Sequence, residues 1–437
     1  MYLPSQAQYC IHKLEQAGFA TYAVGGCVRD SLLGLMPQDY DLCTAAKPET
    51  IAELFSNHTL VRSGEKHGTI GVVLDHQVYE ITTFRTEGGY GDSRHPDWVE
   101  FVEDITLDLA RRDFTVNAMA YSPTRGLADP FGGQKDLNSK ILRAVGDPQI
   151  RFTEDALRIL RGVRFAVRYG LSVEENTKNA MFRLAPLMDK LARERVFDEL
   201  CKLLPLVSAD DLLTFAPILT QVIPELAPSL GFDQRNPHHA YDVFTHIAHV
   251  VEATAPELAL RWAALLHDIG KPNCFTLDEA GKGHFLGHAD QSADMADSIL
   301  LRLKAPTALR SQVGVLIRQH MTRIESEAPA VRRAMSRLGS ETLRQLLLLQ
   351  EADMSSKGTG KPQKMEQFSI LRQLMAQIEA ENACLSIKDL AVNGHDLMAL
   401  GYQGPAIGQA LQYLLELVLE DKVDNTKDAL KHALRNR

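Results

Sequence analysis

Two acidic residues near the N-terminus have the type and spacing that phosphate chemistry requires. Asp39 and Asp41 are separated by one residue, so on a strand their carboxylates would point to the same side. Two carboxylates so near to each other repel, and the usual compensation is a Mg²⁺ ion that also binds substrate phosphates. Glu80 could supply a third carboxylate. Taken alone, an Asp-x-Asp is more often a solvated pair at a strand end, at odds of roughly two to one.

A pair of glycines precedes these carboxylates, in segment 25–30 (GGCVRD). Gly26 and its neighbour let the backbone turn tightly and approach a ligand, and a helix that starts there presents free N–H groups to phosphate. Arg29 adds a guanidinium that can hold phosphate oxygens in two places. A glycine pair before a helix is common by itself. Followed by Asp-x-Asp, it favours a phosphate-binding site over a simple turn.

The elements that must position these residues are a mixture of helices and strands. Periodicity and turn residues predict helices over 5–18, 28–33 and 48–55, and strands over 20–24, 39–43, 69–74 and 78–84. Beyond about residue 148, apolar residues recur at helical spacing as far as the C-terminus. We therefore predict an α+β protein, a mixed α/β head followed by all-helical domains, with domains at 1–145, 146–210, 211–355 and 356–437.

The composition is that of an ordinary globular protein. Its 437 residues are 45% hydrophobic and 24% charged, which excludes a largely disordered or fibrous chain. Lys plus Arg is 47 and Asp plus Glu is 56, so the net charge is 47 − 56 = −9, which argues against a basic coat but not against a local basic groove. Without a signal peptide, a membrane-length apolar run or a CxxC among its six cysteines, we expect a cytoplasmic protein with reduced thiols and no membrane partner.

Two further segments are rich in arginine. Segment 111–119 (RRDFTVNAM) contains Arg112, Asp113 and Asn117, which can hold phosphate and hydroxyl groups. The less favoured alternative is an exposed helix start that Asp113 caps. In segment 154–168, a helix would place four residues on one half of its circumference: Asp155, Arg158, Arg161 and Arg164. On spacing alone, such a run is usually a salt-bridged solvent face.

Together these motifs resemble the signature of the nucleotidyltransferase superfamily, in the class that contains bacterial tRNA CCA-adding enzymes and poly(A) polymerases. The resemblance implies that Asp39 and Asp41 hold two Mg²⁺ ions, with Glu80 as a further catalytic carboxylate. Segment 111–119 resembles the second motif of that family, which contacts ribose and triphosphate. Segment 154–158 resembles its E-D-x-x-R motif.

The E-D-x-x-R resemblance implies a base-reading role for Asp155 and Arg158. A carboxylate accepts from the exocyclic amine that cytosine and adenine share, and an arginine donates to a ring acceptor. Uracil and guanine present carbonyl oxygens at the equivalent place, so they would be rejected without a nucleic-acid template. Arg161 and Arg164 would then serve the triphosphate, and we interpret the related segment 193–200 as a structural brace.

The glycine-containing segment 85–96 resembles the flexible loop of CCA-adding and A-adding enzymes. We therefore predict template-independent addition of CCA to tRNA from CTP and ATP, with A-only addition as the alternative. In these terms the four domains are a catalytic head, a helical neck that reads the base and binds RNA, an HD-type domain and a C-terminal region that binds tRNA. DNA is not an expected partner.

A second group of residues, distant from the first, consists of histidines and aspartates. His246, the doublet His267-Asp268 and Asp353 resemble the metal ligands of the HD hydrolase superfamily, with His288 and His320 as extra ligands for a second metal. Imidazole and carboxylate suit Mn, Fe, Ni, Co or Mg, and phosphoesters are the implied substrates. We assign His238, His239 and His249 no such role, because a lone histidine is more often an ordinary core or surface residue.

This second group leaves two rival interpretations open. One is a metal-dependent HD phosphohydrolase whose head only senses nucleotides. The other is a protein that binds its ligands without turning them over.

Overall fold

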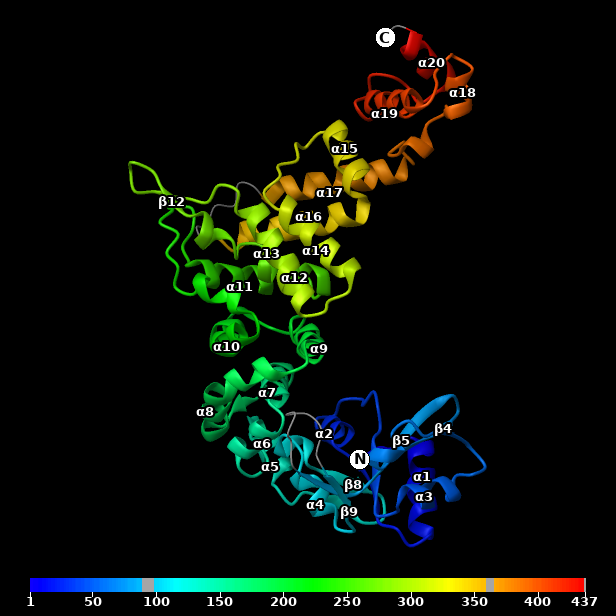
Figure 1. Cartoon of the computed structure of the whole chain (residues 1–437), viewed down its shortest axis with the longest axis vertical. Helices are drawn as coiled ribbons and strands as arrows, with labels where there is room; N and C mark the ends of the chain where they lie inside the picture. Colours follow the sequence, from blue (N-terminus) through cyan, green and yellow to red (C-terminus); the bar gives the residue numbers. More distant parts are fainter. Residues whose placement is uncertain (89–97, 359–364, 436–437) are drawn as a thin grey trace. The chain divides into compact units, whose positions relative to one another are not determined.

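The computed structural model describes residues 1–88, 98–358 and 365–435 (Figure 1). The chain divides into two compact units, Met1–Leu206 with Thr214–Pro224, and Val207–Leu213 with Glu225–Arg437. The carboxylate and arginine motifs belong to the first unit, and the histidine cluster belongs to the second. The predicted boundaries at 145, 210 and 355 stay predictions.

The first unit is built on a seven-stranded mixed sheet. Its strand order is β3 (Thr59–Val61), β4 (Thr69–Leu74), β5 (Gln77–Thr83), β2 (Leu42–Thr44), β1 (Thr21–Val24), β8 (Ala120–Ser122) and β9 (Gly126–Ala128). Strands β2 and β5 pair in parallel, and the other pairs are antiparallel. Asp75 and His76 form the hairpin turn between β4 and β5, and both have the positive φ that a two-residue hairpin loop favours.

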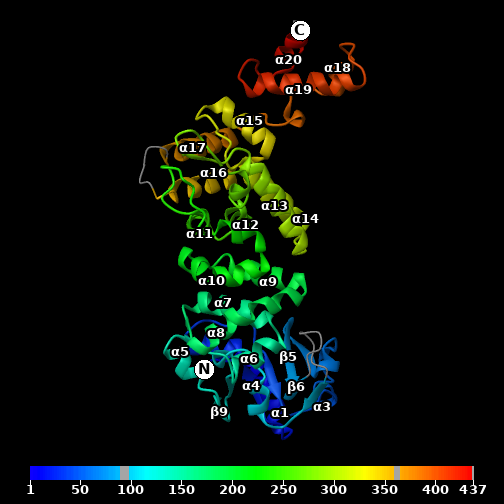
Figure 2. The same ribbon diagram turned by 60° about the vertical axis from the view of Figure 1, so that its left-hand side comes forward.

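Helices pack on this sheet and continue beyond it. Helices α1 (Ser5–Gln16) and α3 (Pro48–Leu54) lie side by side against the sheet (Figures 1 and 2). A short hairpin of β6 (Arg85–Gly88) and β7 (Trp98–Phe101) follows β5. The remaining helices are α2 (Gly26–Leu32), α4 (Ile105–Ala110), α5 (Gly133–Asn138), α6 (Pro148–Glu154), α7 (Leu157–Tyr169), α8 (Glu175–Leu184), α9 (Arg193–Leu203) and α10 (Ala209–Val222), which is divided between the units.

The second unit is almost entirely helical. Helix α16 (Ser340–Ser355) is its central element and packs against α11 (Val243–Ala253), α12 (Leu258–Leu266), α14 (Thr307–Gln319), α15 (Ala328–Leu338) and α17 (Met365–Ala380). Helix α13 (His288–Arg302) packs on α14. The C-terminal helices α18 (Gly394–Met398), α19 (Pro405–Leu419) and α20 (Lys427–Arg435) share a small core of their own, in which Leu397, Leu414 and Leu430 are fully buried.

Three predictions about local structure need correction. The strand expected at 39–43 begins only at Leu42, so Asp39 and Asp41 lie in the extended segment that leads into it. The helix expected to carry Asp155 together with the three arginines is interrupted, because Asp155 has extended backbone angles (φ −145°, ψ 102°) between α6 and α7. Part of segment 85–96 is strand β6, and its residues 89–96 lie outside the described residues.

The length and apolar character of the described helices bear on whether they could cross a lipid bilayer. None of those in residues 1–88, 98–358 and 365–435 is both long enough and apolar enough to cross a membrane.

Gly133, the first residue of α5, lies where a side chain does not fit. A Cβ at this position would be 2.2 Å from the carbonyl oxygen of Thr115. Thr115 begins the short turn that also carries Asn117, one of the predicted nucleotide-binding residues. The backbone of α5 therefore packs directly against the turn of the second motif and helps to hold it in place.

We expect Gly133→Ala to lower the free energy of unfolding by about 1–3 kcal/mol, because the backbone of Thr115 must move. A lower Tm of the full chain would show this. Gly314→Ala is the matched control, since Gly314 lies inside α14 with nothing within 4 Å of an added Cβ. It should instead stabilise the chain by about 0.5–1 kcal/mol through helix propensity. An unchanged Tm for Gly133→Ala would contradict the close approach.

Candidate active site and metal centre

The glycine turn brings three segments of the first unit together. Gly25 has φ +75° and precedes α2 directly after β1. Its N–H donates to the carbonyl of Met119 (3.0 Å), and the N–H of Val24 donates to the carbonyl of Asp41 (3.0 Å). A Cβ on Gly25 would lie 2.8 Å from Nη1 of Arg112, so only glycine leaves room for this arginine. The turn therefore brings Asp41 and Arg112 close together at the end of β1.

The three predicted catalytic carboxylates lie near this turn. Leu42 pairs with Ile81 in the parallel β2–β5 ladder, so the preceding residues, Asp41 and Glu80, occupy neighbouring positions. The pKa of Asp41 is raised above its ordinary value, chiefly by loss of contact with water. Arg112 opposes this rise, and the negative charges of Glu80 and Asp39 add to it. The side chains of Asp39, Asp41 and Glu80 all remain exposed. Three accessible carboxylates that repel one another are a chemically suitable donor set for Mg²⁺.

These head carboxylates are less tightly grouped than the sequence pattern suggests. In the described part of the chain, they do not form a set of three whose ligand oxygens all lie within 4.8 Å of one another. Their separation follows from the extended segment before β2, in which Asp39 is not held by a strand partner.

Arg112 is positioned by an aspartate that the sequence analysis missed. Asp108, on α4, is fully buried and lies 3.0 Å from Nη2 of Arg111 and 3.5 Å from Nη2 of Arg112. It also accepts a hydrogen bond from the backbone N–H of Arg85 (3.2 Å). An aspartate three and four residues before an arginine pair is the signal that could have identified it.

Arg29 is occupied by protein groups in this structure. It is only 5% exposed, donates from Nε to Asp30 (2.8 Å) and from Nη2 to the hydroxyl of Tyr169 (2.5 Å), and Nη1 donates to Asn117. Its guanidinium also lies 4.3 Å from the ring centre of Tyr169 and 5.2 Å from that of Phe165. These contacts connect α2 to α7.

Asp113 forms the core of the second motif. Its Oδ2 accepts from Nε (2.9 Å) and pairs with Nη2 (2.8 Å) of Arg161, and its Oδ1 accepts from the N–H of Phe114 and from Asn117. Burial by itself would raise the pKa of Asp113. Arg161 and the Asn117 hydrogen bond outweigh that effect and lower the pKa to about 2.

The two predicted base-reading residues have different partners. Asp155 pairs with Nη2 of Arg195 at 2.7 Å. Arg158 is 9% exposed and donates to Glu154 (2.9 Å) and to the backbone carbonyls of residues 151 and 111. Arg164 is also buried, and its Nε donates to Glu199 at 2.6 Å. Of the four residues expected on one helical face, only the three arginines share α7.

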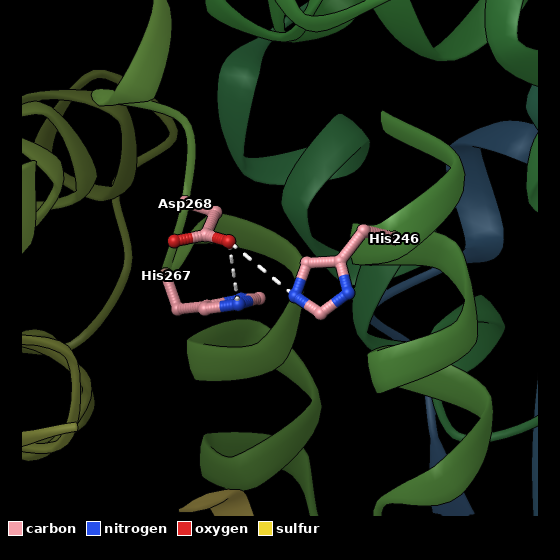
Figure 3. Close-up of side chains that lie close together, drawn as sticks. All are labelled: His246, His267 and Asp268. Carbon is pink, nitrogen blue, oxygen red and sulfur yellow. Dashed lines mark ion pairs between the residues drawn. The ribbon is translucent and has the colours of Figure 1, made fainter. Parts of the chain in front are cut away.

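The histidines and aspartates of the second group come together in the second unit. His246 lies in α11, the doublet His267-Asp268 directly follows α12, and His288 begins α13. His320 follows α14, and Asp353 lies in the last turn of α16. All six side chains are buried. Figure 3 shows His246 directed from its helix toward Asp268 and His267.

Asp268 lies at the centre of this cluster. Its Oδ2 is 3.4 Å from Nε2 of His246 and 3.2 Å from Nε2 of His267. Its Oδ1 is 3.3 Å from Nε2 of His288 and 3.8 Å from Nε2 of His320. Asp353 joins the cluster at 3.0 Å from His246. The sequence-predicted set is therefore brought together completely.

The histidine rings are held in one orientation by backbone carbonyls. Nδ1 of His267, His288 and His320 lies 2.8, 2.7 and 2.6 Å from the carbonyl oxygens of residues 264, 285 and 317, and Nδ1 of His246 lies 3.3 Å from that of Ser356. A carbonyl accepts only from a protonated Nδ1, so in the neutral form of each ring it is Nε2 that carries the lone pair and faces the cluster. This is the arrangement that a metal-binding histidine requires.

Unpartnered atoms in the cluster also suit a metal. Within the described ranges, Nε2 of His267 and both oxygens of Asp268 make no hydrogen bond, although they are buried. Lys271 Nζ lies 2.7 Å from Asp268, and Lys357 Nζ lies 3.2 Å from Asp353, so each carboxylate has an ion-pair partner. The donor set fits a divalent cation.

A cavity of about 230 Å³ adjoins the cluster, and His239 lines it. The sequence analysis gave His239 no role, yet its ring centre lies 5.5 Å from that of His246. Burial and then Lys271 lower the pKa of His239 to about 3. No local sequence signal distinguishes it from its neighbour His238.

Comparison with known proteins identifies the family. The chain matches the Poly A polymerase head domain over residues 21–143, the probable RNA and SrmB-binding site of polymerase A over 170–230, and the putative domain 2 of tRNA nucleotidyltransferase over 283–434. It is 35% identical over 436 residues to the CCA-adding enzyme of Latilactobacillus sakei, covering 99% of this chain and 98% of that protein. The chain belongs to the CCA-adding enzyme family.

Other CCA-adding enzymes agree with this assignment. That of Bacillus velezensis is 32% identical over 429 residues, or 97% of this chain and 96% of that protein. The solved structure of the Bacillus stearothermophilus CCA-adding enzyme in complex with CTP matches with a TM-score of 0.75 and 28% identity, over 100% of this chain and 99% of that one. The predicted family and the α+β fold, with its mixed α/β head and helical remainder, are confirmed.

We expect Asp113→Asn to reduce the stability of the enzyme at neutral pH but not in strong acid. Folding lowers the pKa of Asp113 from about 4 to about 2, so its stabilisation is complete above the unfolded-state pKa and is lost as the pH falls through the folded-state value. The wild type should exceed the variant by about 2 kcal/mol at pH 7. Urea unfolding of the full chain at pH 7 and pH 3 measures the difference, which should shrink at the lower pH. A difference independent of pH would contradict the ion pair.

Proposed function

We propose that this CCA-adding enzyme family member adds CCA to the 3′ end of tRNA from CTP and ATP, without a nucleic-acid template. The single observation that carries the proposal is the full-length similarity to CCA-adding enzymes, 35% over 99% of the chain. The convergence of Asp41, Glu80 and Arg112 beside the glycine turn supports the same reaction. We expect the reaction in the cytoplasm, where tRNA is processed in bacteria.

In the proposed reaction, the 3′-hydroxyl oxygen of tRNA attacks the α-phosphorus of the nucleoside triphosphate. A new O–P bond forms, the bond to the β-phosphate oxygen breaks, and pyrophosphate leaves with the electron pair. Asp39 and Asp41, with Glu80 as a further carboxylate, would hold two Mg²⁺ ions. Bound there, the ions would activate the hydroxyl and neutralise the developing charge of the leaving group.

The remaining head residues would bind and select the nucleotide. Asp155 and Arg158 would read the edge of the base, as the family motif implies. The glycine turn and the surrounding polar side chains would hold ribose and triphosphate: Gly26, Arg29, Arg112, Asp113, Asn117, Arg161 and Arg164. Catalysis would then consist of positioning and charge neutralisation.

The same residues also fit an enzyme that adds only the terminal A. The segment that would bear on the difference, 85–96, lies largely outside the described residues. Three tRNA substrates separate the two activities: one that ends before CCA, one that ends after the first C and one that ends after CC. Incorporation of C into the first two supports CCA addition, and incorporation of A into the third alone supports A addition.

The second unit would hold divalent metal in an HD-type site. His246, His267, Asp268 and Asp353 are the proposed ligands, with His288 and His320 in addition. The buried atoms of His267 and Asp268 that make no hydrogen bond within the described residues support this assignment. Bound metal would supply a phosphohydrolase activity on phosphoesters. The domain boundaries that we propose remain 1–145, 146–210, 211–355 and 356–437.

We expect Asp41→Asn to abolish nucleotide addition and to leave tRNA affinity close to that of the wild type. The substitution removes a charge that Mg²⁺ needs but preserves the size of the side chain. Radiolabelled CTP incorporation and tRNA gel shifts measure the two properties separately. Loss of tRNA binding together with activity would instead mean that Asp41 is structural.

Replacing His267 and Asp268 together by alanine should separate the two proposed sites. Metal bound by the second unit, measured after dialysis against Mn²⁺, should fall, because two ligands are removed. Nucleotide addition should remain close to that of the wild type, since both residues lie outside the head. If nucleotide addition is lost while the chain stays folded by circular dichroism, the head does not act independently of the HD-type site.

A further inference from the structure

Arg195 is the cation that contacts the proposed base-reading carboxylate. Its Nη2 donates to Oδ2 of Asp155 at 2.7 Å, and its Nη1 donates to Oδ1 at 3.4 Å. The arginine that the sequence motif suggests as a partner, Arg158, donates instead to Glu154 and to backbone carbonyls. Arg195 lies on α9, forty residues farther along the chain, in the segment that the sequence analysis interpreted only as a brace.

The hydrogen bonds that Asp155 already accepts leave its carboxylate little capacity to accept more. Oδ1 accepts from the backbone N–H of Leu157 (3.0 Å) and from Nη1 of Arg195, which together use both of its lone pairs. Oδ2 accepts from Nη2 of Arg195. No other donor in the described residues bonds to this oxygen, so one of its lone pairs remains open. The side chains of Asp155 and Arg195 are 16% and 26% exposed, so a ligand can reach this pair.

A single remaining acceptor suits a single N–H donor. The exocyclic amine of cytosine or adenine would supply that donor. The carbonyl oxygen of uracil or guanine would place one acceptor against another, which leaves both without a partner. Discrimination of this kind requires that the carboxylate cannot rotate to offer a different oxygen or a second open site.

We propose that Arg195 is a positioning residue for base selection. By holding both oxygens of Asp155 from α9, it fixes the plane of the carboxylate and directs one acceptor at the base. The proposal rests on the proposed role of Asp155 as a reader of the base. Arg195 itself need not contact the nucleotide.

The test compares nucleotide selection in three variants of the full chain, with CMP against UMP on a tRNA that ends before CCA and AMP against GMP on one that ends after CC. Arg195→Gln should raise incorporation of UMP and GMP relative to CMP and AMP by about tenfold in the ratio of kcat/KM, because the carboxylate is released. Arg195→Lys keeps the charge but supplies one point of contact, so it should give a smaller change. Arg193→Gln, the control, removes the same charge from the same helix. Arg193 donates to the backbone carbonyl of Asp189, so this variant should keep wild-type selection.

Asp155→Ala distinguishes failure of this inference from failure of the proposed function. If Asp155→Ala relaxes selection but Arg195→Gln does not, Asp155 reads the base and Arg195 is only a brace. If neither relaxes selection, the base-reading role of Asp155 is wrong as well. If Arg195→Gln lowers the rate for all four nucleotides equally while its Tm falls, the effect is structural and the inference is overturned.

Discussion

The structure of the head depends on the cost of burying charge. Burying an ion without a partner costs several kcal/mol of free energy. A buried arginine or carboxylate is therefore tolerated only where an opposite charge and hydrogen bonds compensate it. Arg29, Arg158 and Arg164 are each less than a tenth exposed, and each has a carboxylate within hydrogen-bonding distance. Asp108 and Asp113 satisfy the same requirement from the other side. The pairs of Arg158, Asp113 and Arg164 tie α7 to α6, to the second motif and to α9.

The consequence for function is that few of the motif arginines are free in the structure. Most of their guanidinium groups are paired within the protein. Asp39, Asp41 and Glu80 are exposed, and Arg112, Asp155 and Arg161 are partly exposed. The charges of this candidate site are therefore already paired and oriented without a ligand. Preorganisation of that kind is the main source of catalysis in phosphoryl transfer.

The second unit meets the same constraint with neutral groups. Backbone carbonyls accept from Nδ1 of four buried histidines and so direct their Nε2 atoms toward the cluster. The two buried carboxylates take their charge compensation from Lys271 and Lys357. A cluster with paired carboxylates and inward-facing Nε2 atoms is suited to bind a cation. In both units, therefore, the buried carboxylates are paired with a cation: Asp113 and Glu199 with arginines in the first, Asp268 and Asp353 with lysines in the second.

The sequence by itself determined the two groups of chemical residues, the order of the elements and the family. Residue type and local spacing are enough for these, since a glycine turn, an alternating strand or a His-Asp doublet is recognisable within a few positions. Only the tertiary structure decided the partners: Asp155 with Arg195, Arg164 with Glu199, and Asp113 with Arg161. The break at Asp155 was equally invisible, because helical spacing continues across it. Ion pairs join segments that are distant in sequence, and their choice follows from which buried charges meet once the chain has folded.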